Sequence, residues 1–342
     1  MTPDRSLHAL ALDLEPFDWR DGERQVRFGR GRAAEPADLL GDGYTLLTTA
    51  RARAAAPAIA EAAGVVELVA PGRVDELAAA LRPAVGAAGA PLLVALGGGR
   101  VIDTAKALAA ADPPLRVAAI PTTLSGAEMT TVHRHAQGVP ITTPRVRPAI
   151  VLNDPALCAS QPEQELVASA LNALGHAAEG PLTVIANPVA TLAALAGARL
   201  MAGALADAEP ERDALALGAL LSGYAIDSAG YGLHHVMSQT LARLTPAGHA
   251  PANAIMLPHT LRALERRFPE RMARLAAALG DDPPSLAARL ARRTGAARLR
   301  ERGVTPEMLA ECADAAAERP ELALTPPPAD RAELLALYES AY

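Results

Sequence analysis

Short apolar runs alternate with longer Ala- and Leu-rich segments along the first half of the chain. The short runs are typical of buried strands, and the longer segments have the apolar spacing of helices. Strands are predicted at residues 25–28, 44–48, 65–69, 92–96, 117–120 and 149–152, with helices at 51–63, 74–88 and 103–111. This alternation predicts a parallel sheet with helices on both of its faces.

The pattern changes near residue 154, where strand signals end and helical periodicity continues to Tyr342. Helices are predicted at residues 163–180, 188–206, 210–245 and 250–266, followed by shorter ones beyond residue 270. We therefore expect two domains, a Rossmann-like α/β domain at residues 1–155 and an all-helical domain at residues 156–342. The predicted fold class is α/β followed by all-α.

The composition agrees with a globular chain, because half of the 342 residues are hydrophobic and 20% are charged. The net charge of −6 and the lack of a basic tract argue against a nucleic-acid partner. No apolar run is long enough to predict a membrane span, and the first residues lack the pattern of a signal peptide. We therefore expect a cytoplasmic protein. Its two cysteines, Cys158 and Cys312, are not spaced as a metal or disulfide motif.

A glycine-rich turn is the clearest local motif. A predicted strand runs into Gly97, Gly98 and Gly99 and then directly into a helix that contains Asp103 and Lys106, the only lysine of the chain. Glycines allow a ligand to approach the backbone closely, and the N-terminus of a helix attracts a pyrophosphate. The turn is not the GxGxxG fingerprint, so a plain strand-to-helix turn remains the alternative.

A second turn between residues 120 and 130 also follows a strand and is rich in hydroxyl groups, including Thr122, Thr123 and Ser125. The two turns are about one βα unit apart, which places both at the sheet edge where open α/β folds bind ligands. Taken alone, the second turn is equally typical of a polar loop with a helix cap.

The strand at residues 44–48 is followed by Thr49, with no acidic residue to hold the 2′-hydroxyl of a nucleotide ribose. NADH and NADPH therefore both remain open, and Arg51 or Arg53 would favour NADPH.

Three histidines of the helical half are candidate catalytic or metal-binding groups: His176, His235 and His249. Asn172 and His176 are four residues apart and share one helix face. Three imidazoles converging from separate helices would suit Zn²⁺ or Fe²⁺, with one position open for a substrate. The alternative for each histidine is a core or surface residue without a ligand.

Together these motifs resemble the iron-containing alcohol dehydrogenase superfamily over about residues 28–327, with a dehydroquinate synthase-like architecture. The resemblance rests on the GGG turn with Asp-Thr-Ala-Lys, the PTT turn ending in Glu-Met-Thr, the motif Asn-Ala-x-x-His-Ala-x-Glu, and a His-His pair followed later by His. Asn172 stands where the alcohol dehydrogenases carry Asp. This position, the compact PTT turn and the adjacent His234 and His235 make the chain similar to the maleylacetate reductase branch.

The resemblance implies NADH or NADPH in the cleft between the domains, bound by these residues: Gly97, Gly98, Gly99, Asp103, Thr122, Thr123, Ser125 and Thr49. His176, His235 and His249 match the metal ligands of the metal-dependent members, with Asn172 as a candidate fourth ligand for Zn or Fe. Gln239 stands where the family commonly has a further histidine near the substrate, and it is assigned to the catalytic group with the three histidines.

The implied reaction is hydride transfer to a carbonyl or carbon–carbon double bond beside a carboxylate, on a small anionic substrate. The implied assembly is a homodimer joined through the N-terminal strands. Without a metal, one of the three histidines in its charged form would stabilise the developing enolate or alkoxide. Two alternatives remain open, a metal-dependent alcohol dehydrogenase and a nucleotide-binding pseudoenzyme.

Cationic partners for the substrate are expected among Arg145, Arg147 and Arg243. The family often places a lysine near the cofactor in the segment at residues 132–147, and this chain has none there. His133, His135, Arg145 and Arg147 are the candidates to replace it.

Overall fold

The computed structural model describes residues 14–34, 36–207, 209–295 and 297–342. Its strands form one seven-stranded sheet in the order β1-β2-β7-β6-β5-β3-β4. The strands are β1 (Phe17–Asp21), β2 (Arg24–Phe28), β3 (Thr45–Thr48), β4 (Val65–Leu68), β5 (Leu92–Gly97), β6 (Arg116–Pro121) and β7 (Ile150–Asn153). All six predicted strands are confirmed to within two residues at each end.

The sheet is parallel except at one edge, where β1 pairs antiparallel with β2. The expectation of a wholly parallel sheet is therefore wrong at β1. Its sequence, Phe-Asp-Trp-Arg-Asp, alternates apolar and charged residues, and it turns back through Asp21 and Gly22 as a hairpin does. The alternation was a strand signal, but one short polar-rich edge strand has few buried positions to reveal it.

Both faces of the sheet are covered by helices, as predicted. Along β5, Leu93 and Ala95 pack with buried residues of α4 (Val74–Ala88) and α5 (Gly99–Ala111) on one face. The residues between them, Val94 and Leu96, pack on the other face with residues of α2 (Ala50–Ala55) and α3 (Pro57–Glu61). Since side chains alternate along a strand, a continuous apolar run fills both layers.

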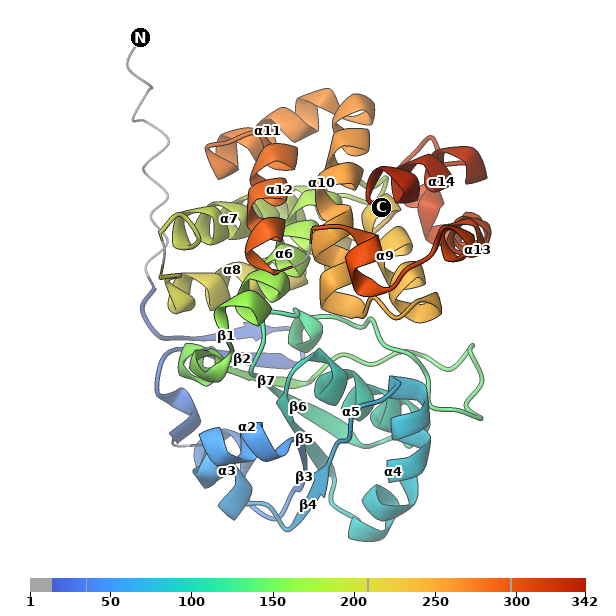
Figure 1. The fold of residues 1–342 in the computed structure, drawn as a ribbon. Coiled ribbons are helices and arrows are strands. Elements are labelled where there is room, and N and C mark those ends of the chain that lie inside the picture. Colours follow the sequence, from blue (N-terminus) through green and yellow to red (C-terminus); the bar gives the residue numbers. More distant parts are fainter. Residues whose placement is uncertain (1–13, 35, 208, 296) are drawn as a thin grey trace.

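The helical half consists of α6 (Glu163–Glu179), α7 (Pro188–Ala204), α8 (Arg212–Ala229), α9 (Leu233–Leu244), α10 (His249–Arg267), α11 (Pro269–Leu279), α12 (Pro283–Arg293), α13 (Pro306–Ala317) and α14 (Arg331–Ser340). No strand follows β7 in the described residues, as expected. In Figure 1 these helices occupy the upper half of the molecule, above the sheet and the shorter helices that flank it.

Two predicted helices are wrong because each is broken. The helix predicted at residues 51–63 ends at Ala55 and restarts at Pro57, which lacks the N–H needed to continue a helix. The helix predicted at residues 210–245 divides at Gly230, whose φ of 69° closes α8, so that α9 starts anew at Leu233.

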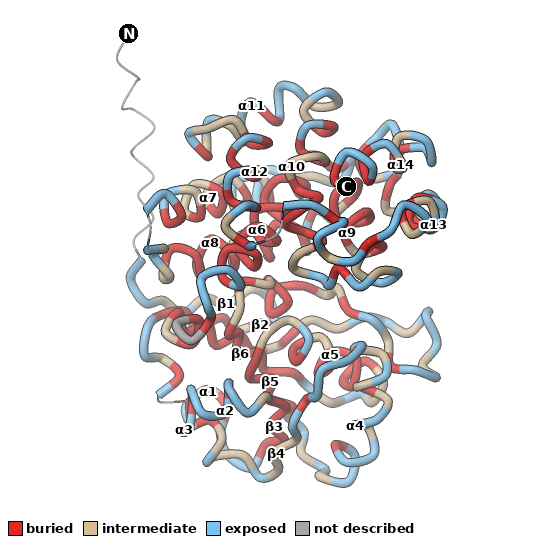
Figure 2. Tube along the Cα trace, in the orientation of Figure 1, coloured by how far each residue is buried: buried red, intermediate tan, exposed pale blue. Residues whose placement is uncertain are grey.

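One large hydrophobic core joins the helical half to the sheet, because Val26, Phe28 and Val151 belong to the same cluster as the helices. Figure 2 shows buried positions concentrated along the central strands and the inner helices. The division into domains at residues 155 and 156 stays a prediction. No helix in the described part of the chain is long and apolar enough to cross a membrane.

Candidate active site

The glycine-rich turn and the second turn lie side by side at the carboxyl edge of the sheet. Strands β5 and β6 are parallel neighbours, with Gly97 opposite Pro121, and the N–H of Thr122 donates to the carbonyl of Gly97 at 3.0 Å. A Cβ on Gly98 would lie 3.1 Å from Thr123, and one on Gly99 would lie 3.1 Å from Ser125. A side chain at either glycine would crowd this contact, and the predicted meeting of the two turns is confirmed.

Helix α5 starts at this edge with its N-terminus uncapped by any side chain among the described residues. Its first N–H groups and the positive end of its dipole therefore point toward the edge, where an anion would be stabilised. Thr49 follows the neighbouring strand β3, and its hydroxyl already accepts a hydrogen bond from Ala52 at 3.2 Å as the cap of α2. Arg51 and Arg53 are exposed on the same helix.

Lys106 is fully buried and ties the second turn to α5. Its ammonium donates to the carbonyl oxygens of Ala127, Thr130 and Val132 at 2.8–3.0 Å and lies 2.7 Å from a carboxylate oxygen of Asp103. This network gives the only lysine a structural role. Burial raises the pKa of Asp103, and the Lys106 charge opposes that shift.

His176 of α6 and His235 of α9 form the centre of the helical side of the site. Their buried rings stack with centroids 4.7 Å apart, and the ring of His234 meets His235 edge-on at 4.9 Å. A Cβ on Gly175 would lie 2.9 Å from His234 and 3.3 Å from His235. Glycine at this position is what lets the histidine pair pack directly on α6.

Glu179, one turn along α6 from His176, holds the start of α9. Its carboxylate accepts from the N–H groups of Gly232, His234 and His235 at 2.7–3.2 Å and from Nδ1 of His235 at 2.7 Å. Burial raises the pKa of Glu179, and these donors act against the rise. The contact places the proton of His235 on Nδ1, so Nε2 carries the lone pair. Glu179 was not among the residues predicted from the sequence, although it ends the family-like motif around His176.

Asn172 fixes the other ring. Its amide nitrogen donates to the carbonyl of Ser125 at 3.2 Å and lies 3.4 Å from Nε2 of His176, which it meets as a donor. Nε2 of His176 is therefore an acceptor, and the proton stays on Nδ1, which has no partner among the described residues.

This arrangement does not fit a bound metal as it stands. The amide nitrogen of Asn172 lies 3.4 Å from Nε2 of His176, the atom that would bind a metal, and His249 is exposed although its charge acts on both His176 and His235. The described residues contain no group of three or more His, Cys, Asp or Glu that could hold a metal ion. Metal binding by His176, His235, His249 and Asn172 stays a prediction.

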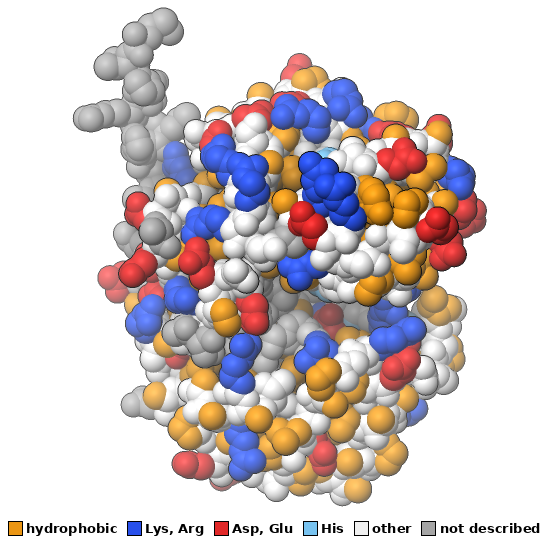
Figure 3. Space-filling view, viewed as in Figure 1, with side chains coloured by type: hydrophobic (Ala, Val, Ile, Leu, Met, Phe, Trp, Pro, Cys, Tyr) orange, Lys and Arg blue, Asp and Glu red, His pale blue; other side chains and the backbone are white. Residues whose placement is uncertain are grey.

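His249 starts α10 and faces the sheet half across the cleft. Loss of solvent around the ring lowers its pKa, the charge of Asp103 acts to raise it, and the charge of Arg134 lowers it further. The effect of Asp103 shows that His249 lies near α5, the helix that follows the glycine-rich turn. Figure 3 shows the surface hollowed between the two halves, with Lys or Arg side chains on parts of the rim.

The buried histidines are neutral at pH 7. Burial, together with the neighbouring histidine charges, lowers the pKa of His176, and it lowers the pKa of His235 to about 3. Stabilisation of an oxyanion by a charged ring stays a prediction, and the lowered pKa values of His176 and His235 do not favour it. Neutral rings act through a lone pair or an N–H group instead.

Gln239 lies one turn after His235 on α9, and its side-chain oxygen accepts from Arg319 at 3.2 Å. Arg319 also donates to the hydroxyl of Tyr231 at 3.3 Å, and the Tyr231 ring lies 5.7 Å from that of His235. Arg319 and Tyr231 were missed from the sequence. Arg319 precedes a short element outside any recognisable motif, and Tyr231 lies just before the His-His motif without being part of it.

The predicted arginines separate into two groups. Arg147 pairs with Asp21 and Glu23 at the β1–β2 hairpin, so it is committed elsewhere. Arg145 and Arg243 are exposed; the charge of Arg145 acts on Tyr231, and that of Arg243 acts on Arg134.

Of the two histidines in the neighbouring loop, His133 is buried. Its Nδ1 donates to the carbonyl of Arg134 at 2.9 Å, and its Nε2 accepts from the N–H of Val146 at 3.3 Å. The ring of His135 meets it edge-on at 5.5 Å. Neutral His133 thus ties the two ends of the loop together.

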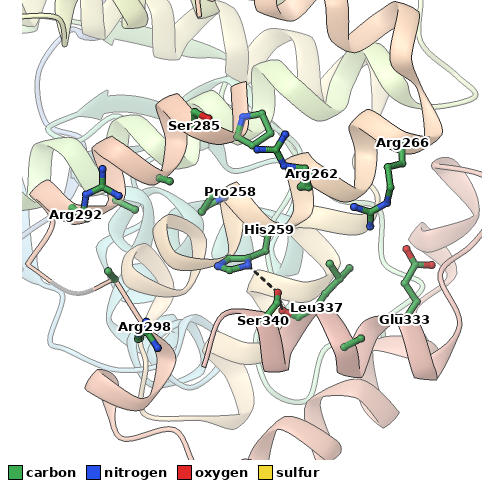
Figure 4. Close-up of a pocket in the computed structure, with 15 residues that line it drawn as sticks. Pro258, His259, Arg262, Arg266, Ser285, Arg292, Arg298, Glu333, Leu337 and Ser340 are labelled. Carbon is green, nitrogen blue, oxygen red and sulfur yellow. Dashed lines mark hydrogen bonds between the residues drawn. The ribbon is translucent and has the colours of Figure 1, made fainter. Parts of the chain in front are cut away.

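A separate groove of about 820 Å³ lies on the outer side of the helical half (Figure 4). Its lining includes His259, Arg262, Arg266, Arg292, Arg298 and Ser340. His259 is ten residues beyond His249 on α10, or about 15 Å along the helix axis, so this groove is not part of the histidine site.

Comparison with known proteins agrees with the fold and the motifs. The model of the iron-containing alcohol dehydrogenase family matches residues 24–155, and the model of the family's C-terminal part matches residues 166–342. A maleylacetate reductase from Rhizobium sp. (strain MTP-10005) is 32% identical over 96% of this chain and 98% of its own length.

Solved structures lead to the same group. A maleylacetate reductase from Agrobacterium tumefaciens is 30% identical with a TM-score of 0.80, covering 96% of this chain and 98% of its own. An iron-containing alcohol dehydrogenase from Corynebacterium glutamicum is 29% identical with a TM-score of 0.80, covering 93% and 94%. The chain therefore belongs to the iron-containing alcohol dehydrogenase family and is an NAD(P)-dependent oxidoreductase of its maleylacetate reductase-like branch.

Proposed function

We propose that this chain reduces the carbon–carbon double bond of maleylacetate, or of a closely similar unsaturated keto-dicarboxylate, with NADH or NADPH. Two observations carry the proposal: a buried, neutral histidine pair that has Arg319 near it through Tyr231 and Gln239, and a glycine-rich turn that leads into the uncapped N-terminus of α5. The relatives named maleylacetate reductase support the choice of substrate.

The pyrophosphate of the nucleotide binds at Gly97–Gly99, against the first N–H groups of α5. Thr122, Thr123 and Ser125 flank it from the adjoining turn, and Asp103 lies one turn into the helix. Thr49 stands at the end of β3, where a ribose would lie. Arg51 and Arg53 are exposed nearby and can pair with a 2′-phosphate, which keeps NADPH beside NADH in the proposal.

The reaction forms one C–H bond by hydride transfer from the nicotinamide to the carbon β to the ketone. The electron pair of the double bond moves toward the ketone oxygen and gives an enolate, which then takes one proton at the α carbon. Nδ1 of His176 is an N–H donor without a partner and would stabilise the enolate oxygen. The proton comes from solvent water, which Nε2 of His235, held by Glu179 through Nδ1 and without a partner among the described residues, would orient by accepting a hydrogen bond.

We further propose that the enzyme is a cytoplasmic homodimer. Strand β1 is the edge of the sheet and has a hydrogen-bonding side unpaired in the described chain, which a second copy would cover. Two domains, divided at residues 155 and 156, belong to the same proposal.

The test is oxidation of NADH and of NADPH by the purified protein with maleylacetate, followed by the loss of nicotinamide absorbance. We expect turnover, and we expect it to persist after treatment with a chelator because the histidine site is closed by Asn172. Nucleotide binding without turnover would contradict the proposal and favour the pseudoenzyme. Activity lost with the metal and restored by Zn²⁺ or Fe²⁺ would instead favour a metal-dependent alcohol dehydrogenase.

A further inference from the structure

Arg319 is an arginine held in a fixed position beside the histidine pair. Its Nε and Nη2 atoms form a two-point contact with Glu321 at 2.9 Å each, and Nη2 also donates to Tyr231 and to Gln239. Only 21% of its side chain is exposed. Nη1 makes no hydrogen bond within the described residues, so the guanidinium retains donors for a further oxygen atom.

The residues that contact Arg319 show that it lies near the His176–His235 pair rather than on the outer surface. The Tyr231 ring that contacts Arg319 lies 5.7 Å from the ring of His235. Gln239, which also contacts it, is one helical turn from the same histidine. A ligand contacting the histidines therefore comes within one side chain of this guanidinium.

Further positive charge gathers at the same place. The charges of Arg243 and Arg319 both act on Arg134, whose own charge acts on His249. Arg73 pairs with Asp75 and Arg319 with Glu321, but no ion pair to Arg134 or Arg243 is found within the described ranges. The charge of Asp75 also acts on Arg134, but the four arginines of this group face only two carboxylates, Asp75 and Glu321, so an entering anion would be stabilised here.

We propose that Arg319, together with Arg134, binds the remote carboxylate of a dicarboxylate substrate, and that Gln239 positions Arg319 for this contact. The inference rests on the proposed function and adds the group that selects dicarboxylates over monocarboxylates. The carboxylate contacts the unused donors of Arg319 while the double bond lies at the histidines. Arg134 supplies the second charge from the loop that follows the second turn.

Gln239 gives this chain its own form of the site. The family commonly carries a histidine at this place, and a glutamine offers a neutral oxygen that accepts from Arg319 at pH 7 without titrating. Gln239, which stands where the resemblance implies a histidine, therefore orients the guanidinium of Arg319. Gln239 acts through Arg319, so it is a positioning residue and not a catalytic one.

The test compares Arg319→Gln and Arg319→Lys with the unchanged enzyme on maleylacetate and on its monomethyl ester at the remote carboxylate. We expect Arg319→Gln to raise KM for maleylacetate about 10- to 100-fold, because a charge-assisted hydrogen bond is lost, with little change in kcat. KM for the monoester should change less than about threefold, and Arg319→Lys should lie between. An equal rise in KM for both substrates, or none, would overturn the inference.

A double-mutant cycle tests the role of Gln239. Gln239→Leu alone should raise KM for maleylacetate several-fold, and Gln239→Leu with Arg319→Gln should be no worse than Arg319→Gln alone. Independent, multiplying effects would show that Gln239 does not act through Arg319. Arg292→Gln in the outer groove is the matched control and should leave both KM values unchanged.

Binding of adipate to the enzyme–NADPH complex, measured by calorimetry, separates this inference from the proposed function. Tighter binding of adipate than of its monomethyl ester, lost in Arg319→Gln, supports the inference even if maleylacetate is not reduced. Turnover of maleylacetate with no effect of Arg319→Gln on KM or on adipate binding leaves the proposed function standing and rejects the inference. Each variant is first shown by its Tm to be folded.

Discussion

Two regions of the helical half are rich in arginine, and they differ in what surrounds the charge. Beside the histidines, Arg319 is fixed by Glu321, Tyr231 and Gln239, within reach of a buried ring pair. In the outer groove, Arg262, Arg266, Arg292 and Arg298 are exposed, and Figure 4 shows Arg292 and Arg298 directed away from each other. An arginine can select one anion over another only where neighbouring residues hold its guanidinium in a fixed orientation.

The largest expected effect sharpens this difference between the two regions. His235→Ala should lower kcat/KM about 100- to 10,000-fold, because it removes an unpartnered lone pair at the proposed reacting centre. His259→Ala, which changes the histidine of the outer groove, should leave kcat/KM within about twofold. Steady-state kinetics with both variants decide the question, and comparable losses would abolish the distinction.

The next effect concerns the carboxylate that holds the inner site. Glu179→Ala should lower the free energy of unfolding by about 3 kcal/mol or more, because three backbone N–H groups and His235 lose a buried acceptor. Urea denaturation followed by circular dichroism measures this quantity. Glu333→Ala at the outer groove serves as the control and should cost less, and an equal cost would show that burial gives Glu179 no special weight.

A pH effect should separate the buried region from the exposed one. Burial lowers the pKa of His133 to about 4, against an ordinary value of 6.5. The unfolded chain therefore takes up a proton first as the pH falls, and stability is lost between about pH 6.5 and pH 4. The loss from this residue reaches about 3 kcal/mol below pH 4.

His133→Gln removes this titration while keeping a donor and an acceptor. We expect the fall in unfolding free energy between pH 6.5 and pH 4 to be smaller in the variant than in the parent chain. The other buried histidines are present in both proteins, so the difference reports His133. Identical pH profiles would show that His133 is as solvated in the folded chain as in the unfolded one.

A smaller effect is expected from restoring the family's carboxylate. Asn172→Asp removes the amide donor from His176 and should tighten Zn²⁺ binding by about 10-fold or more, since a carboxylate is the better ligand. Metal content after dialysis and the shift of Tm with added Zn²⁺ both measure it. Equal Zn²⁺ affinity in the two proteins would mean that Asn172 does not close the site.

The least effect is expected at the outer groove itself. Arg292→Gln should change the unfolding free energy by less than about 0.5 kcal/mol and leave activity unchanged, because the side chain is exposed. A loss of activity there would break the comparison and require a role for the outer groove.

The fold was largely predictable because its signals are local. Apolar runs marked β2–β7, and α4 begins and ends at the predicted residues. The errors also have local causes, since Pro57 and Gly230 ended helices that the apolar spacing alone would continue. The charged positions of β1 left its strand pattern weak.

The site was predictable only where a motif carries it. The two turns and the three histidines were identified from the sequence. The distances between these side chains in the fold were not, because the spacing of residues along the chain does not determine them. The roles of three further residues depend on contacts between positions 53 to 90 residues apart in the sequence; these residues are Arg319, Tyr231 and Glu179. The neutral state of the histidines followed from burial, which only the packed helices reveal.

The burial of Lys106 has a practical consequence. Since the chain has no other lysine, an amine-directed reagent finds no lysine side chain to modify while the protein is folded. Labelling at residue 106 would therefore begin only when α5 separates from the second turn. The rate of labelling at Lys106 would therefore measure how often α5 separates from the second turn.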